Sequence, residues 1–159
     1  IVFHKDAVTN GINALKKGHS IVVDVNGVIG GLNKQNPKDF GNKLICNISD
    51  PDLAEQAKKE NKTRAQMSMR VVASEMNGGI VAIGNAPTAL LEIIQMISEK
   101  VTKPALVVGI PVGFVAAAES KEKLQTSDVP FITNVGRKGG SSCAASIVNA
   151  LYKLLRESS

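Results

Sequence analysis

Polar residues follow a short apolar run abruptly in the segment GGIVAIGNAPTALLEII, residues 78–94. The run IVAI stops at Gly84, and a helical pattern begins with Pro87 and Thr88. Proline suits the first turn of a helix, because its missing N–H would have no partner there. The backbone N–H groups at such a turn can bind an anion. We therefore predict an anion-binding junction that uses Asn85 and Thr88; the alternative is that these two side chains only cap the helix.

A second cluster combines cations with glycines in the segment VGRKGGSS, residues 135–142. Arg137 and Lys138 precede two glycines and a helix that begins near Ser141. Cations beside a helix N-terminus are unfavourable unless an anion offsets them, and arginine can bind a carboxylate through two parallel hydrogen bonds. The segment therefore predicts anion binding at Arg137 and Ser141. It is not a Walker A loop, because the Gly-Lys-Ser/Thr ending is absent.

Arg64 repeats this pattern, because it follows Thr63, the expected N-cap of another helix. The alternative for Arg64 is a solvated surface arginine. His4 and His19 lie in expected loops, and no GxSxG, HExxH or Cys/His pattern accompanies them. The residues alone therefore predict an anion-binding region without an evident catalytic group.

Composition and charge exclude several classes of protein. The chain has 159 residues, which predicts a single domain over residues 1–159. Nineteen Lys and Arg against fourteen Asp and Glu give a net charge of +5, which is either a basic surface without a purpose or an attraction for anionic partners. One Tyr, four Phe and no Trp offer little for base stacking, so nucleic acid is not expected as a partner.

The expected localisation is the cytoplasm. No signal peptide is visible, and the apolar stretch ALVVGIPVGFVAAA is broken by Pro111 and two glycines, so no membrane span is expected. Cys46 and Cys143 have apolar neighbours and no CxxC context, which predicts reduced thiols rather than a disulfide or a metal site. The chain starts with Ile1 rather than Met, and we expect that its native amino-terminal segment is missing.

Apolar runs of strand length alternate with amphipathic patterns of helix length. Strands are expected at residues 20–25, 43–48, 80–83, 104–110 and 130–135. Helices are expected at residues 6–17, 50–60, 63–76 and 113–124, with two more that begin at Pro87 and near Gly140. This alternation predicts an α/β fold in which helices cover both faces of a parallel sheet.

The expected sheet brings the polar junctions together. Right-handed crossovers place the carboxyl ends of parallel strands along one edge, and ligands bind there near the point where the strand order reverses. Asp24, near the end of the first expected strand, and Asn26, directly after it, join Asn85 and Arg137 at this edge. We therefore predict a single crevice with a positive bias. Lys121, on the helix behind this edge, is expected to face solvent.

Six segments distributed over the chain resemble the precorrin-8X methylmutase family of cobalamin biosynthesis, also called precorrin isomerase. These segments are VFHKDAV, LICNISDP, NKTRA, VAIGNAPTALL, GIPVGFVAAAESK and VGRKGGSSCAASIVNAL, in the order of the family. The similarity runs from Val2 to Leu151. It implies a three-layer, flavodoxin-like α/β/α fold with a five-stranded, mainly parallel sheet, and a homodimer that binds substrate near its interface.

The resemblance also implies a reaction and a set of binding residues. The family moves a methyl group from C11 to C12 of precorrin-8X or cobalt-precorrin-8, giving hydrogenobyrinate or cobyrinate, without a redox cofactor or a metal of its own. The acetate and propionate arms and the edges of this macrocycle are expected to contact Asp24, Asn26, Arg64, Asn85, Thr88, Arg137 and Ser141.

The catalytic residue stays unassigned. The resemblance implies one catalytic histidine, and the matching segment of the family lies upstream of Ile1, so the role is not carried over to His4 or His19. Gly27 falls where relatives commonly have Met, a change that could loosen the wall of the pocket or bring the macrocycle closer.

Two other functions stay open. A non-catalytic tetrapyrrole carrier of the same pathway would use the same residues to bind its ligand. A nucleotide- or flavin-binding module rests on analogy of fold alone. The missing GxGxxG spacing and the few aromatic residues count against this second alternative.

Overall fold

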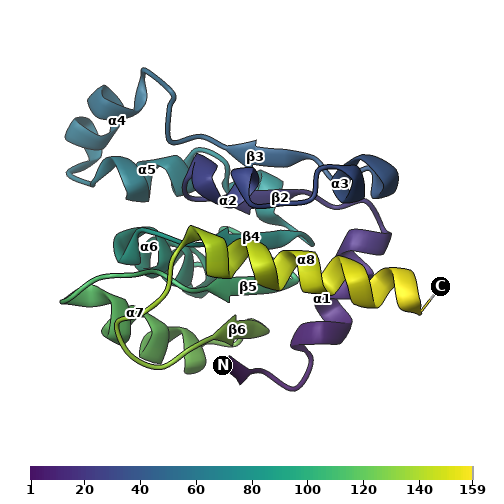
Figure 1. Ribbon diagram of the computed structural model, residues 1–159. Coiled ribbons are helices and arrows are strands. Elements are labelled where there is room, and N and C mark those ends of the chain that lie inside the picture. Colours follow the sequence, from purple (N-terminus) through teal and green to yellow (C-terminus); the bar gives the residue numbers. More distant parts are fainter. Residues whose placement is uncertain (159) are drawn as a thin grey trace.

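The computed structural model describes residues 1–158 as one six-stranded sheet with helices on both faces (Figure 1). The strands are β1 (Val2–Phe3), β2 (Ile21–Val23), β3 (Leu44–Cys46), β4 (Ile80–Ile83), β5 (Leu106–Gly109) and β6 (Phe131–Thr133). The helices are α1 (Ala7–Lys16), α2 (Asn26–Gly30), α3 (Gln35–Phe40), α4 (Leu53–Glu60), α5 (Arg64–Arg70), the 3-10 helix η1 (Ala73–Met76), α6 (Pro87–Ser98), α7 (Ala116–Gln125) and α8 (Ser141–Glu157).

The strand order is β1-β6-β5-β4-β2-β3, and every pair except β1–β6 is parallel. The five strands expected from the sequence are confirmed, but the expectation of a five-stranded sheet is wrong. The sixth strand, β1, has only two residues, too few to show the alternation by which a strand is detected. It pairs antiparallel with β6, with Val2 opposite Thr133.

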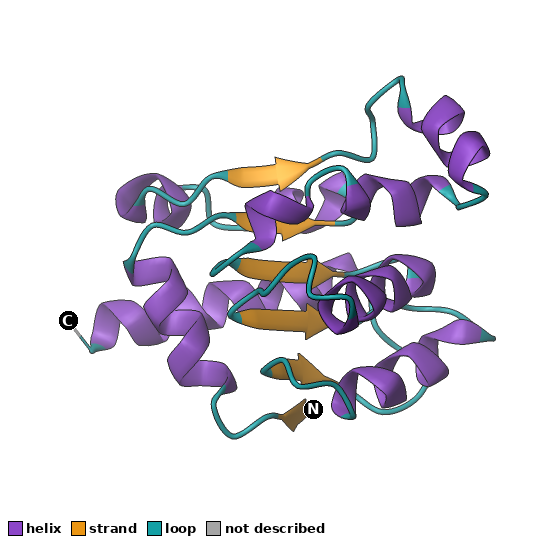
Figure 2. Ribbon diagram, turned by 180° about the vertical axis from the view of Figure 1, so that it is seen from behind, coloured by secondary structure: helices purple, strands orange, loops and turns teal. Residues whose placement is uncertain are grey.

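Two apolar cores, one on each face, hold the helices against the sheet. Successive side chains of β2 point to opposite faces of the sheet. Ile21 and Val23 pack with α1, α2 and α8, whereas Val22 packs with α5, α6 and α7. Figure 2 shows the face covered by α5, α6 and α7. Burial on both faces explains why the parallel strands are continuous apolar runs.

The strand order reverses between β2 and β4. After β2 the chain adds β3 on one side, then crosses back and adds β4, β5 and β6 on the other. The connections that leave β2 and β4 therefore diverge to opposite faces of the sheet at its carboxyl edge, which lies on the left in Figure 1. This is the topological switch point at which open α/β sheets bind ligands.

Several helix boundaries differ from the expected ones. The helix expected over 63–76 divides into α5 and η1, although its start is confirmed by a capping box between Thr63 and Gln66. The helix expected from Asp50 begins at Leu53 instead, because the Asp50 carboxylate and carbonyl first accept bonds from the N–H groups of Asp52 and Leu53 in a turn.

The short helices α2 and α3 were not expected at all. They have five and six residues, which is less than two turns, and therefore show no clear helical period. Within residues 1–158, no helix combines the length and the hydropathy that a bilayer span requires.

Candidate functional site

The carboxylate of Asp24 joins the two strands of the switch point. Asp24 directly follows β2 and is only 1% exposed. Its Oδ1 accepts a hydrogen bond from the N–H of Gly84 at 2.9 Å, and its Oδ2 accepts from Asn85 at 3.0 Å and from Ala86 at 2.8 Å. The backbone groups expected to hold an external anion are therefore bound to a carboxylate of the chain itself. These three N–H groups are therefore not free for an external anion, and the binding of an anion by Asn85 and Thr88 stays a prediction.

Burial raises the pKa of the Asp24 carboxyl above its usual value, and the hydrogen bonds from Ala86, Gly84 and Asn85 oppose this rise. Because the pKa is raised on balance, the three bonds do not fully offset the loss of water around the charge. Asp24 therefore fixes the geometry of the junction at some cost in stability.

Three elements meet beside this carboxylate, and two glycines allow them to approach. A Cβ atom on Gly84 would lie 2.7 Å from the Cα of Ser141, the first residue of α8. A Cβ atom on Gly27, in α2, would lie 3.2 Å from the Ser141 hydroxyl oxygen. A larger residue at position 27 would therefore require Ser141 to shift. The close approach places Asn85, which is exposed, and Ser141 in one region.

Asn26 and Arg64 lie on the rim formed by the loop after β3. The Asn26 amide donates to the hydroxyl of Ser49 at 3.3 Å. The Arg64 guanidinium donates to the carbonyl of Ile48 at 2.8 Å, and the side chain is exposed. Both predicted binding residues thus contact neighbouring positions of a single loop. Thr88 is half-buried in the first turn of α6.

The loop of residues 134–140 lies against the turn at Pro111. The Gly113 N–H donates to the carbonyl of Arg137 at 3.2 Å, and the Gly140 N–H donates to Ile110 at 3.0 Å. At Gly139, a Cβ atom would lie 2.4 Å from the carbonyl oxygen of Ile110, so only glycine fits this backbone contact. The Arg137 guanidinium lies 5.4 Å from the centre of an exposed phenyl ring, that of Phe114.

The edge carries cations without acidic partners. None of the ion pairs within residues 1–158 involves Arg64, Arg137 or Lys138. Two acidic residues at this edge are already engaged by the backbone: Asp24 is bound to three N–H groups, and the Asp50 carboxylate accepts from a backbone N–H of its own loop. The arrangement can bind a polyanionic ligand through charge-assisted hydrogen bonds.

A search of protein families matches residues 1–154 to the model described as precorrin-8X methylmutase. The chain belongs to the precorrin-8X methylmutase family. Over 151 residues it is 53% identical to a cobalt-precorrin-8 methylmutase of Priestia megaterium, a match that covers 95% of the chain and 67% of the relative. It is 39% identical to a precorrin-8X methylmutase of Sinorhizobium over 154 residues, which are 96% of the chain and 73% of that relative.

Solved structures of the methylmutase family have the same fold. A precorrin-8X methylmutase from Thermus thermophilus superposes with a TM-score of 0.89 at 34% identity, over 99% of this chain and 77% of that one. The similarity extends over both cores and the whole carboxyl edge. The fold is therefore that of the methylmutase family over 99% of the chain.

Neither histidine lies at the carboxyl edge of this methylmutase fold. His4 follows β1, its N–H donates to the carbonyl of Phe131 at the start of β6, and its ring packs edge-to-face on that phenyl ring at 5.7 Å. His19 is exposed in the turn before β2. Both positions are at the amino ends of parallel strands, opposite the predicted binding residues.

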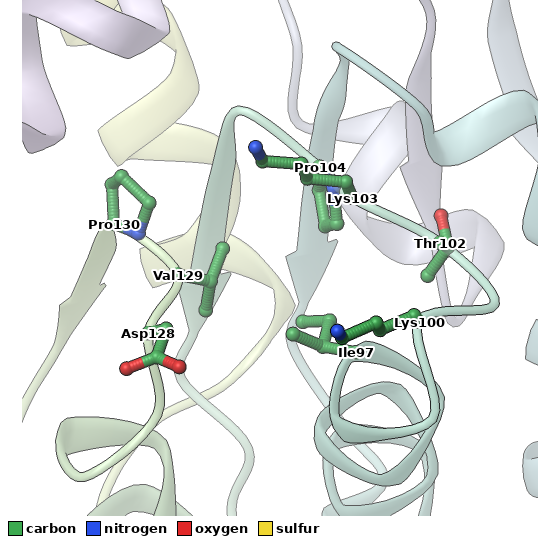
Figure 3. A pocket seen from close by; sticks show the side chains of 8 residues that line it. All are labelled: Ile97, Lys100, Thr102, Lys103, Pro104, Asp128, Val129 and Pro130. Atoms are coloured by element: carbon green, nitrogen blue, oxygen red, sulfur yellow. The ribbon is translucent and has the colours of Figure 1, made fainter.

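A surface hollow also lies away from this edge. It opens between the loop from α6 to β5 and the loop from α7 to β6, at the amino ends of these strands (Figure 3). The residues lining it are Ile97, Lys100, Thr102, Lys103, Pro104, Asp128, Val129 and Pro130. None of the residues expected to bind substrate is among them.

Lys121 is buried, so the expectation that it faces solvent is wrong. Its side chain is 1% exposed, and burial lowers the pKa of its ammonium group. A signal was available, because Ala117, Lys121 and Leu124 have the spacing of four and three residues that marks a buried helix stripe. The charge of the side chain outweighed this spacing in the prediction.

Proposed function

We propose that this protein catalyses the methyl migration from C11 to C12 of cobalt-precorrin-8 or precorrin-8X, an isomerisation in cobalamin biosynthesis. Membership of the methylmutase family supports the reaction. The observation that carries the proposal is that Arg64, Arg137 and Lys138 lie at the same carboxyl edge as the Asp24 junction, where such sheets bind ligands, and form no ion pair within residues 1–158. A macrocycle with acetate and propionate arms is the kind of polyanion that this edge can hold.

The cobalt-containing substrate is favoured over the metal-free one. The Priestia megaterium relative, a cobalt-precorrin-8 methylmutase, is 53% identical to the chain, whereas the Sinorhizobium precorrin-8X methylmutase is 39% identical. In cobalt-precorrin-8 the cobalt would belong to the macrocycle rather than to the protein.

Orientation of the macrocycle is the task we assign to the residues of the edge. Arg64 and Arg137 bind carboxylate arms, while Asn85, Thr88 and Ser141 offer uncharged groups to its rim. A charge-assisted hydrogen bond contributes about 1.5–3 kcal/mol when buried and less than about 1 kcal/mol when solvated, so several anchors are needed. Asp24 acts differently from our first expectation, by holding the backbone from which Asn85 projects.

A histidine ahead of Ile1 is proposed as the proton donor that assists the methyl shift. The direction of β1 supports this placement: because β1 runs antiparallel to β6, Ile1 lies beyond Thr133 at the carboxyl edge. Residues that precede Ile1 in a longer chain would therefore enter at this edge. A positioned general acid typically contributes about 10²–10⁴-fold to a rate.

We further propose a homodimer that forms through an apolar patch at the same edge. Phe114, Val115 and Val135 are 85%, 87% and 75% exposed, and Val112 is 43% exposed. Adjacent large apolar side chains of this kind typically mark an interface. Val115→Glu should give a monomer in light scattering, whereas Val101→Glu, at the opposite edge, should not. A monomeric wild type at micromolar concentration would argue against the dimer.

Two features support a flavodoxin-like fold and a location in the cytoplasm. The five parallel strands follow the order of flavodoxin-like sheets, with the first in sequence between the second and third. Cys46 and Cys143 are free thiols, as expected in the cytoplasm.

The decisive experiment incubates protein from the longest encoded reading frame with each substrate. Conversion should give a product of unchanged mass with the absorption spectrum and retention time of the corrin. The second candidate is a tetrapyrrole carrier, which the position of His4 and His19 favours. A carrier would bind hydrogenobyrinate without converting either substrate, and failure to bind any corrinoid would contradict both functions.

A further inference from the structure

The ammonium group of Lys121 binds the backbone of the loop of residues 134–140, which carries Arg137. Its Nζ donates to the carbonyl of Gly136 at 2.9 Å and to the carbonyl of Lys138 at 2.5 Å. The side chain reaches these groups from α7, the helix after β5. Residues 136 and 138 flank Arg137, so a single cation fixes the loop on both sides of the predicted binding residue.

A buried lysine is costly and normally has an acidic partner. Within residues 1–158, no carboxylate forms an ion pair with Lys121. Its contacts are carbonyl dipoles, which stabilise the ammonium group without cancelling its charge. The positive charge of Lys121 therefore adds to the charges of Arg137 and Lys138, which lie in the loop that it binds.

Other bonds direct the loop in the same way. The Arg137 carbonyl accepts from the Gly113 N–H, and the Lys138 carbonyl also accepts from the Asn134 amide at 2.9 Å. The carbonyls of three successive residues, Gly136 to Lys138, are thus bound to the protein. The oxygens of these carbonyls therefore already accept hydrogen bonds from the protein, while the Arg137 side chain extends over Phe114.

We propose that Lys121 is a positioning residue for the carboxylate arms of the substrate. It turns the loop carbonyls inward, so that they do not repel an anion, and holds Arg137 where it binds one. The positive charge of Lys121, next to the loop backbone, strengthens the attraction between the loop and a carboxylate arm. This role rests on the proposed function of the edge, and it assigns to Lys121 no contact with the reacting carbons.

The test measures binding of hydrogenobyrinate, by absorbance titration, to wild type, Lys121→Met, Arg137→Ala and the double variant. Lys121→Met should weaken binding about tenfold, and it should have little further effect once Arg137 is Ala, because contacting groups are coupled. Combined with Arg64→Ala, its effect should instead add. Lys123→Met, two residues along α7 on an exposed position, is the matched control and should bind as wild type does.

Thermal unfolding shows whether Lys121→Met folds. If it does not, Lys121→Gln takes its place: glutamine keeps N–H donors inside the protein, but its side chain is one atom shorter and uncharged, so it does not hold both carbonyls. The same weakening and the same coupling to Arg137 are expected. Wild-type affinity in the folded variant, or full additivity with Arg137→Ala, would overturn the positioning role and leave the proposed function intact. A wild type that binds no hydrogenobyrinate would overturn both.

Discussion

Gly84 and Ser141 lie in contact through their backbones, so that a Cβ atom on Gly84 would come within 2.7 Å of the Ser141 Cα and 3.0 Å of its nitrogen. This contact sets α8 against the junction between β4 and α6. Since backbone atoms cannot yield as a flexible side chain does, even a methyl group would separate the two elements.

Gly84→Ala should therefore destabilise the protein by about 1–3 kcal/mol, the usual cost of overpacking, and weaken corrinoid binding. Urea unfolding and absorbance titration measure the two effects. Gly30→Ala is the control, because a Cβ atom there meets nothing within 4 Å; it should be neutral or stabilising in the helix. Equal behaviour of the two variants would contradict the contact.

Replacement of Asp24 should loosen the switch point. In Asp24→Asn, an NH2 group replaces one of the two carboxylate oxygens and cannot accept, so either the bond from Gly84 or the bonds from Asn85 and Ala86 are lost. Each buried N–H that loses its partner costs about 1–3 kcal/mol, so a loss in this range is expected at pH 7. Hydrogen exchange should also become faster at the one or two amides that lose their acceptor. A variant with unchanged exchange would show that the hydrogen bonds to Asp24 are not needed to hold this turn.

The pH dependence of this effect has a definite sign. Because burial raises the native pKa of Asp24 above that of the unfolded chain, folding favours the protonated carboxyl. Its contribution to stability is therefore greatest below the unfolded-state pKa of about 3.9 and declines as the pH rises through the native pKa. The stability of wild type relative to Asp24→Asn should decline with rising pH and then level off. A difference that grows with pH would contradict the raised pKa.

Much of the fold could be predicted because each parallel strand can be detected from its own short stretch of sequence. Val22 and Val81 sit in β-branched runs that are buried on both faces, and the polar residues after such runs must share one edge. The antiparallel pairing of Val2 with Thr133 could not be predicted, because it depends on a partner far along the chain.

The limits of prediction are clearest where one side chain replaces an external ligand. The sequence shows an anion-binding turn at Gly84 but not that Asp24, sixty positions earlier, occupies it. Likewise, Lys121 carries a charge that predicts exposure, and only the loop carbonyls from Gly136 and Lys138 explain its burial. Long-range hydrogen bonds decided both positions.

Glu92 is expected to be a stability determinant of the helix that carries Arg64. Its carboxylate, 3% exposed in α6, pairs with Lys62 at 3.1 Å and with Arg70, and accepts from Gln66 at 3.1 Å. These bonds hold α5 against α6. Glu92→Gln should cost about 3 kcal/mol in urea unfolding, the low end for a broken buried pair.

Glu55→Gln is the matched control for that change. Glu55 pairs with Lys59 at 3.6 Å on the surface of α4, where both side chains are more than 70% exposed. Its loss should cost less than about 0.5 kcal/mol. A similar cost for the two variants would mean that the Glu92 cluster contributes no more than a surface pair.

Arg137 should contribute affinity that depends on ionic strength. Arg137→Ala removes both a cation and its stacking on Phe114, and we expect corrinoid binding to weaken about tenfold in dilute buffer. Since salt screens exposed charges, with a Debye length of about 3 Å at 1 M, the difference from wild type should shrink as salt is added. Lys103→Ala removes the same charge at the hollow on the opposite edge and should leave affinity unchanged (Figure 3). If both variants bind equally weakly, net charge alone attracts the ligand; if Arg137→Ala binds as wild type does, the loop of residues 134–140 does not contact the carboxylate arms.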